Sequence, residues 1–328
     1  MVESLPVITV LCPDHDDEHA VPPGLDELGG QAEIRLTTAA KLTEDIQGAD
    51  VLFLWDFFSE AVADAWGSAD ALKWIHVAAA GVDKLLFDDL VSSDVVVTNA
   101  QGTFDRPIAE YVLGAVLARA KDIPGSLRRQ RTRTWEHRET QRVQGTTALV
   151  IGTGAIGREI TTVLRAIGVE VFAAGRTARQ GDADFGTVIA SEDLAEHIGA
   201  ADVVINAAPL TQHTTGLIDA EVLAAVKDGA HLINIGRGET VDQDALHRAL
   251  KDGPLGFATL DVFDEEPLPE ESPLWDRDDV LISAHMSGDV VGWREALADQ
   301  FIRNAQNWLA EKDLVNVVDK DKGYVPRS

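Results

Sequence analysis

A glycine-rich turn, GTGAIG at residues 152–157, constrains the fold of this chain more than any other sequence feature. It follows an apolar run at residues 148–151 that predicts a buried parallel strand. Apolar residues then recur at helical spacing up to Gly168, and residues 169–174 form a second apolar run. A strand, a glycine-rich turn, an amphipathic helix and a second strand, in this order, predict a β-α-β unit that binds a dinucleotide.

The glycines of this turn suit a pyrophosphate. One glycine allows the tight turn, one lets the backbone approach the ligand, and one lets the helix pack closely on the strand. The helix N-terminus adds free N–H groups and a positive dipole end. The alternative is a purely structural glycine-rich turn. We expect the cofactor to be bound by Gly152, Gly154, Ala155, Ile156 and Gly157.

The residues after the second strand indicate which dinucleotide is bound. An NAD site usually has Asp or Glu about 20 residues after the glycines, where it bonds the ribose 2′-hydroxyl. Here Gly175 is followed instead by Arg176, Thr177 and, two residues later, Arg179. No carboxylate repels a 2′-phosphate, and these side chains can bind one. We predict NADP(H) as the preferred cofactor and NAD(H) as the weaker one; the alternative is a solvated basic loop.

Length and composition limit the remaining possibilities. A chain of 328 residues can form two domains. No apolar run approaches the ~18 residues of a membrane span, and the N-terminus lacks the pattern of a signal peptide, so we expect a soluble, cytoplasmic protein. Cys12 is the only cysteine, which excludes internal disulfides and a cysteine-based metal cage. His15 and His19 lie in an acidic segment without ligand spacing, so we expect a solvated loop and no metal.

The net charge of −27 argues against nucleic acid and anionic membranes as partners, because both are repelled by an acidic surface. The acidic residues are scattered along the chain, and only nine residues are lysine. Such a composition resembles that of salt-adapted archaeal cytoplasmic proteins; the alternative is an ordinary acidic enzyme. Unfolding at low and at multimolar KCl separates the two, because added salt screens the repulsion between surface charges.

Strand-like runs alternate with helical stretches along the whole chain, which predicts parallel α/β packing. A long helix with its apolar stripe at residues 293–308 follows the last strand, and the terminal VNVVDKDKGY is expected to pack back onto the first domain. The expected strands are residues 7–11, 33–37, 51–55, 74–78, 95–98, 203–206, 231–235, 257–262 and 280–284.

Two loops are further candidates for ligand binding. The segment AAAGVD at residues 78–83 follows a strand, and its small side chains expose backbone N–H groups that can hold a carboxylate; a plain tight turn is the alternative. The segment 128–142 is the only strongly basic stretch. We expect it to frame the entrance to an anionic cofactor or substrate, with Trp135 packed there or in the core.

Three strand ends carry residues suited to carbonyl reduction: Arg237, Glu266 and His285. Arginine binds a substrate carboxylate and polarises the carbonyl, histidine donates a proton, and the carboxylate holds the imidazolium and raises its pKa. Each residue taken alone also fits a structural role. Together, at the carboxyl ends of one nucleotide-binding sheet, they predict an active site.

The chain resembles the D-2-hydroxyacid dehydrogenase family over nearly its whole length. The matching motifs are GTGAIG, INIGRGETVD, LDVFDEEPLP and AHMSG, with AAAGVD, NAQG, AAPLTQHTTGLI and NVVDKDKGY. The resemblance implies two doubly wound α/β domains with parallel sheets, a Rossmann cofactor domain (residues 101–287) being inserted into a flavodoxin-like substrate domain (residues 1–100 and 288–328). It also implies a homodimer formed through the cofactor domains.

The resemblance also implies a role for each candidate residue. Arg237 and His285 bind substrate, His285 as proton donor, and Glu266 orients the histidine. The backbones of Ala80 and Gly81 hold the substrate carboxylate. Asp261 is the implied partner of the nicotinamide carboxamide.

Two positions depart from the family pattern. Ala284 stands where proline is common before the histidine, and alanine constrains that turn less. Gly175-Arg176 replaces the usual acid, which is similar to NADP-preferring glyoxylate and hydroxypyruvate reductases.

These features predict reversible NADP(H)-dependent reduction of small 2-ketoacids to D-2-hydroxyacids. Two alternatives stay open. One is a non-catalytic nucleotide-sensing protein on the same fold, and the other is a formate or phosphite dehydrogenase.

Overall fold

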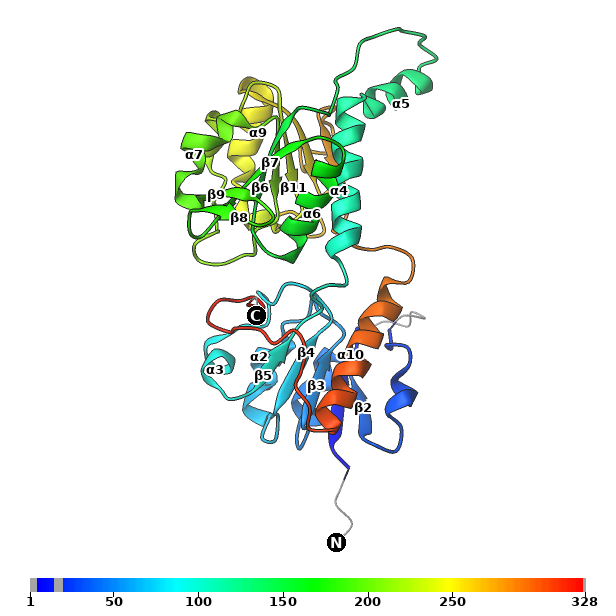
Figure 1. The fold of residues 1–328 in the computed structure, drawn as a ribbon. Coiled ribbons are helices and arrows are strands. Elements are labelled where there is room, and N and C mark those ends of the chain that lie inside the picture. The colour runs from blue at the N-terminus through cyan, green and yellow to red at the C-terminus, as the bar shows by residue number, and fades with distance from the viewer. Residues whose placement is uncertain (1–4, 15–19, 327–328) are drawn as a thin grey trace. The chain divides into compact units, whose positions relative to one another are not determined.

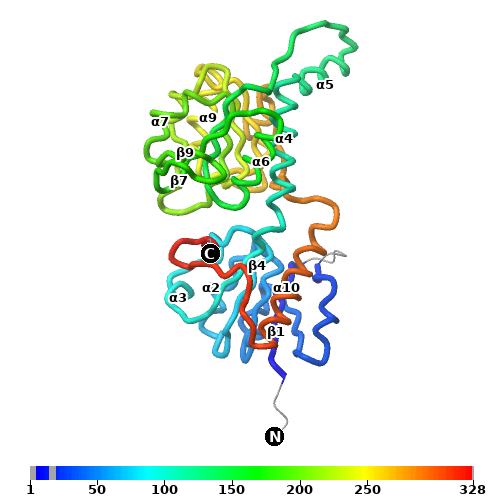
Figure 2. Tube along the Cα trace, viewed as in Figure 1, coloured from blue at the N-terminus to red at the C-terminus, as the bar shows by residue number. Residues whose placement is uncertain are grey.

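The computed structural model describes residues 5–14 and 20–326, so His15 and His19 lie outside the described residues. The chain divides into two compact units (Figure 1). Unit 1 combines Met1–Phe104 with Val290–Ser328, and unit 2 is Asp105–Asp289. Figure 2 traces the blue N-terminal part and the red C-terminal part of the chain into the same unit.

Unit 1 contains a five-stranded parallel sheet of order β2-β1-β3-β4-β5. This is the order of flavodoxin-like folds, in which ligands bind at the carboxyl ends of the strands. The strands are β1 Val7–Leu11, β2 Glu33–Thr37, β3 Val51–Leu54, β4 Trp74–Val77 and β5 Val96–Thr98. The helices are α1 Leu42–Asp45, α2 Ala61–Ala65, α3 Asp88–Ser92 and α10 Trp293–Leu309.

The C-terminal part of the chain completes the core of unit 1. Phe301 of α10 stacks on Phe53 of β3, with ring centroids 3.9 Å apart. Beyond α10, the amide of Val318 donates to the carbonyl of Val97 at 2.8 Å, and the Lys320 ammonium donates to carbonyls at the end of α3. The expectation that the terminal segment packs back onto the first domain is therefore confirmed.

Unit 2 contains an eight-stranded sheet of order β13-β12-β11-β10-β6-β7-β9-β8. Its parallel strands β9-β7-β6-β10-β11-β12 follow the 3-2-1-4-5-6 order of dinucleotide-binding folds. Strand β6 lies at the centre. The strands are β6 Thr147–Ile151, β7 Glu170–Gly175, β8 Arg179–Asp182, β9 Gly186–Ala190, β10 Val203–Asn206, β11 Ala230–Asn234, β12 Leu255–Leu260 and β13 Val280–Ile282. The helices are α4 Asp105–Ala120, α5 Ile123–Arg131, α6 Ala155–Ala166, α7 Leu194–His197, α8 Ala220–Ala224 and α9 Gln243–Asp252.

The sequence-based expectation of a doubly wound α/β fold is confirmed, and every expected strand is present with ends shifted by at most two residues. One feature differs. β8 pairs antiparallel with β9 at the edge of the sheet, whereas only parallel pairing was expected. The sequence of β8, RQGD, is polar on both faces, so no apolar alternation marks it as a strand.

Candidate active site

The glycine-rich turn joins β6 to α6 and leaves open space above Gly154. Gly152 has φ +109°, and a Cβ there would lie 2.6 Å from the Ala207 carbonyl oxygen, so only glycine fits. A Cβ on Gly157 would overlap the Gly152 carbonyl oxygen, which explains how α6 approaches the strand so closely. A Cβ on Gly154, by contrast, would meet no atom within 4 Å.

This turn fits the pyrophosphate of a dinucleotide. The first two residues of helix α6 are Ala155 and Ile156, and no side chain caps its N-terminus at Gly154. Uncapped N–H groups and the positive end of the helix dipole therefore face the open space. The fit rests on backbone alone, so it is independent of side-chain rotamers.

The residues that follow β7 form an ion-pair network at the start of the β8–β9 hairpin. Arg176 and Thr177 lie in the turn between β7 and β8, as the sequence predicts for a 2′-phosphate site. Arg179 lies in β8, and its Nε and Nη2 atoms are 2.9 and 2.8 Å from Oδ2 of Asp182. Asp182 is only 8% exposed and also pairs with Arg158 of α6 at 3.1 Å. The Arg158 hydrogen bond lowers the pKa of the Asp182 carboxyl, although burial opposes it, so Asp182 stays charged.

A buried polar network holds Arg237, which follows β11. Nδ2 of Asn234 and Oγ1 of Thr240 both donate to the Arg237 carbonyl, at 3.1 and 2.6 Å. Nδ2 of Asn206 donates in turn to Oδ1 of Asn234 and Oγ1 of Thr240. These three buried residues were not predicted from the sequence. The available signal was an asparagine at the carboxyl end of each of two adjacent strands, β10 and β11.

Glu266 and His285 lie in direct contact. Nδ1 of His285 is 2.8 Å from Oε2 of Glu266, and both side chains are about one-third exposed. Oε1 of Glu266 accepts the Phe263 amide at 2.9 Å. Burial would raise the pKa of the Glu266 carboxyl, but hydrogen bonds from His285 and Phe263 and the charges of His285 and Arg237 lower it below its ordinary value. The structure thus brings an ionised carboxylate, an imidazole and a guanidinium to one edge of the sheet.

Asp261, after β12, holds the turn that carries His285. Its side chain is fully buried, and its carboxylate accepts the amides of Met286 and Ser287 at 3.0 and 2.9 Å. Its carbonyl accepts the amide of His285 at 2.8 Å. The resemblance implied a nicotinamide contact for Asp261; the contacts observed here are with the histidine turn.

In unit 1, the turn after β4 presents the backbone expected to bind a carboxylate. Across the described residues, the amides of Ala80 and Gly81 donate no hydrogen bond, and both residues are half-buried. Nδ2 of Asn99 donates to the Ala80 carbonyl at 2.5 Å and fixes the turn. Two such amides next to each other are suited to an anion.

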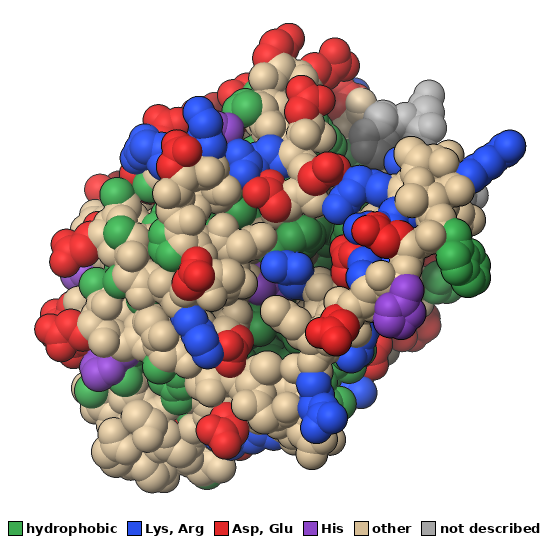
Figure 3. Space-filling model, turned by 90° about the horizontal axis from the view of Figure 1, so that it is seen from above, with side chains coloured by type: hydrophobic (Ala, Val, Ile, Leu, Met, Phe, Trp, Pro, Cys, Tyr) green, Lys and Arg blue, Asp and Glu red, His purple; other side chains and the backbone are tan. Residues whose placement is uncertain are grey.

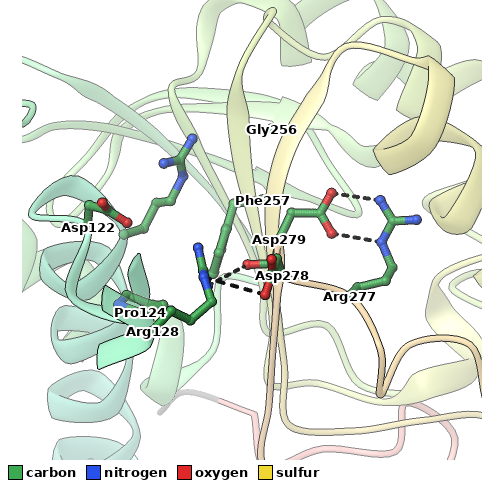
Figure 4. Close-up of a pocket in the computed structure, with 9 residues that line it drawn as sticks. Asp122, Pro124, Arg128, Gly256, Phe257, Arg277, Asp278 and Asp279 are labelled. Carbon is green, nitrogen blue, oxygen red and sulfur yellow. Dashed lines mark hydrogen bonds and ion pairs between the residues drawn. The ribbon is translucent and has the colours of Figure 1, made fainter. Parts of the chain in front are cut away.

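The basic segment 128–142 does not frame this edge of the sheet of unit 2. Arg128 of α5 contacts Asp278, which precedes β13, and both line a cavity of about 430 Å³ with Phe257 at the start of β12 (Figure 4). They therefore lie at the amino ends of the strands, opposite Glu266 and His285. The expectation was wrong because α4, with 16 residues, spans about 24 Å and carries α5 to the far edge. Trp135 is fully exposed rather than packed.

Charged side chains of both signs are interspersed on the face seen in Figure 3, with acidic ones scattered among basic ones. Over residues 5–14 and 20–326, no helix has the length and apolar character needed to cross a bilayer. The same ranges contain no group of three or more His, Cys, Asp or Glu side chains placed to hold a metal ion.

Comparison with known proteins identifies a related family. The model of the D-isomer specific 2-hydroxyacid dehydrogenase, NAD binding domain, matches residues 113–287. The glyoxylate reductase of Thermofilum pendens is 31% identical over 275 residues, which cover 80% of this chain and 79% of that protein. The (S)-sulfolactate dehydrogenase of Chromohalobacter salexigens is 36% identical over 63% of this chain and 68% of its own length.

A solved structure is similar over both units. It is a D-isomer specific 2-hydroxyacid dehydrogenase from Xanthobacter autotrophicus in complex with NADPH and MES. The TM-score is 0.82 and the identity 29%, and the match covers 98% of this chain and 100% of that one.

Proposed function

Because this chain belongs to the D-isomer specific 2-hydroxyacid dehydrogenase family, we propose that it reduces small 2-ketoacids to D-2-hydroxyacids, reversibly and with NADP(H). The observation that carries the proposal is the 2.8 Å contact between His285 and Glu266, close to Arg237 at the carboxyl edge of a nucleotide-binding sheet. An acid, its orienting carboxylate and a carboxylate-binding guanidinium are the protein groups that this reaction needs.

Each residue has a role in the proposed mechanism. The nicotinamide supplies the hydride when it is bound. Arg237 binds the substrate carboxylate and polarises the carbonyl, and the amides of Ala80 and Gly81 bind carboxylate oxygens. Since Nδ1 of His285 faces Glu266, Nε2 is the atom that donates a proton to the carbonyl oxygen. Glu266 fixes the ring and stabilises the imidazolium, which becomes neutral as the alkoxide is protonated.

NADP(H) preference rests on the turn after β7. Arg176 and Thr177 stand where an NAD-preferring site has an acid, and nothing in this turn repels a 2′-phosphate. The Xanthobacter relative, crystallised with NADPH, supports the same choice. NAD(H) is the weaker cofactor in this proposal.

Steady-state assays test the function directly. The 2-ketoacids, supplied with NADPH or NADH, are glyoxylate, pyruvate, 2-ketobutyrate, 2-ketoisocaproate and phenylpyruvate. Formate and phosphite are supplied with NADP⁺ or NAD⁺. We expect turnover of at least one 2-ketoacid and a higher kcat/KM with NADPH. NADPH binding without turnover of any substrate would favour a non-catalytic nucleotide-sensing protein. Oxidation of formate or phosphite alone would favour a formate or phosphite dehydrogenase.

The setting of the protein is also proposed. We infer a cytoplasmic homodimer that acts on small molecules, without nucleic acid or membrane partners. The net charge of −27 supports stabilisation by multimolar salt, since screening relieves repulsion among the acidic side chains.

A further inference from the structure

A chain of hydrogen bonds runs from α4 to the turn that carries His285. The hydroxyl of Tyr111, in α4, is 2.6 Å from Oγ of Ser283, which follows β13. Oγ of Ser283 donates to Oδ1 of Asp261 at 2.5 Å. The same carboxylate accepts the amides of Met286 and Ser287 on the far side of the histidine.

The direction of the hydrogen bonds follows from chemistry. The Asp261 carboxylate accepts two backbone N–H groups and one hydroxyl, so Ser283 must give it the only hydroxyl proton that Ser283 has. Tyr111 must therefore donate to Ser283. Burial, opposed by the Ser283 hydrogen bond and helped by the charge of Asp261, raises the pKa of Tyr111 to about 12, so its hydroxyl keeps the proton to donate.

The turn needs such support because His285 has an unusual backbone. Its φ is +49°, a left-handed conformation that is strained for a residue with a side chain. Asp261 accepts the amides of residues 285, 286 and 287 through its carbonyl and both carboxylate oxygens. A rotation of this carboxylate would release two of the three amides and let the histidine turn relax.

We propose that Tyr111 and Ser283 are positioning residues for the reaction, which hold the Asp261 carboxylate so that the left-handed turn keeps His285 against Glu266. The hydrogen bonds of Tyr111 and Ser283 lead to Asp261, so both residues act on the Glu266–His285 pair through Asp261. The inference rests on the proposed function for its effect on turnover, whereas the effect on the turn itself does not depend on any activity.

The variants are Ser283→Ala, Ser283→Thr and Tyr111→Phe, with Tyr324→Phe as the matched control. Tyr324 is the only other tyrosine and lies in unit 1. Two properties are measured: hydrogen exchange of the amides of residues 285–287, and kcat and KM for the 2-ketoacid and NADPH. For a residue that positions the proton donor, we expect kcat to change and the KM for NADPH to stay within twofold.

We expect Ser283→Ala to speed exchange of these amides at least tenfold and to lower kcat about 10- to 100-fold, because small displacements of a catalytic group have effects of this size. Tyr111→Phe should have the same effects to a lesser degree. Ser283→Thr, which keeps a hydroxyl, should behave as wild type, and Tyr324→Phe should change neither property.

The outcomes separate this inference from the proposed function. Unchanged exchange overturns the inference, and so does faster exchange with unchanged kcat, or a raised KM for NADPH as the only kinetic effect. Wild-type protein that turns over no 2-ketoacid contradicts the proposed function, whereas the exchange measurement still tests whether Ser283 and Tyr111 hold the turn.

Discussion

Nδ1 of His285 lies 2.8 Å from Oε2 of Glu266, and the other carboxylate oxygen of Glu266 accepts the Phe263 amide. The carboxylate is thus fixed from one side by backbone and presents its second oxygen to the imidazole. Because these contacts lower the pKa of Glu266, it is ionised throughout the neutral pH range. The contact through Nδ1 gives the ring a defined orientation, and in the proposed function Nε2 is the atom that donates the proton.

Glu266→Gln removes the charge and keeps the shape of the side chain. We expect reductive kcat to fall about 10- to 100-fold, because the protonated imidazole loses its carboxylate. The measurement is reductive kcat at saturating NADPH in wild type and variant. Equal kcat in the two proteins would contradict the role of Glu266.

Arg237→Lys keeps the charge but loses the planar fork. We expect kcat/KM for the 2-ketoacid to fall at least tenfold, because one ammonium does not reproduce a bidentate contact with a carboxylate. The KM for NADPH should change little. Arg142→Lys, at an exposed position, is the control. Equal kcat/KM for wild type and Arg237→Lys would rule out bidentate binding.

Arg176→Ala tests cofactor choice. Loss of a charge-assisted hydrogen bond to the 2′-phosphate should raise the KM for NADPH about 10- to 100-fold and leave the KM for NADH within about twofold. Arg179→Ala should also raise the KM for NADPH, but pairing with Asp182 offsets part of the charge of this guanidinium. KM values for both cofactors measure this. An equal rise for NADPH and NADH would show that Arg176 does not discriminate between them.

The sequence predicted the fold because most residues of the buried strands are apolar and the glycine-rich turn identifies the central unit. It also predicted the residues at the strand ends, since carboxyl ends of parallel strands meet at one edge. The contact of Arg179 with Asp182 was not predicted, because it depends on an edge hairpin without apolar alternation. Tyr111 and Ser283 were missed because they lie 172 positions apart and neither belongs to a motif.

Two buried histidines make the protein sensitive to acid. Burial lowers the pKa of His76 and of His231 to about 3, with the charge of Arg119 adding to the effect at His231. Since the unfolded chain binds these protons near pH 6.5, folding stability falls as pH decreases from about 6.5 toward 3. Each histidine should lower the free energy of unfolding by about 2 kcal/mol as the pH falls from 6.5 to 5.

Urea unfolding at pH 7 and pH 5 measures this loss. The difference in unfolding free energy between pH 7 and pH 5 should be smaller in His76→Phe and in His231→Gln than in wild type, whatever the stability of each variant at pH 7. His137→Gln, at an exposed position, should behave as wild type. If the unfolding free energy falls by the same amount between pH 7 and pH 5 in wild type and in all three variants, His76 and His231 are not the source of the acid sensitivity.

The central claim is that His285 donates the proton in 2-ketoacid reduction. The most direct measurement is kcat for glyoxylate reduction with saturating NADPH in wild type and His285→Ala, together with NADPH binding by fluorescence. We predict that kcat falls by about 10²–10⁴ while NADPH affinity stays within a few-fold. Near-normal turnover of the His285→Ala variant would contradict the account.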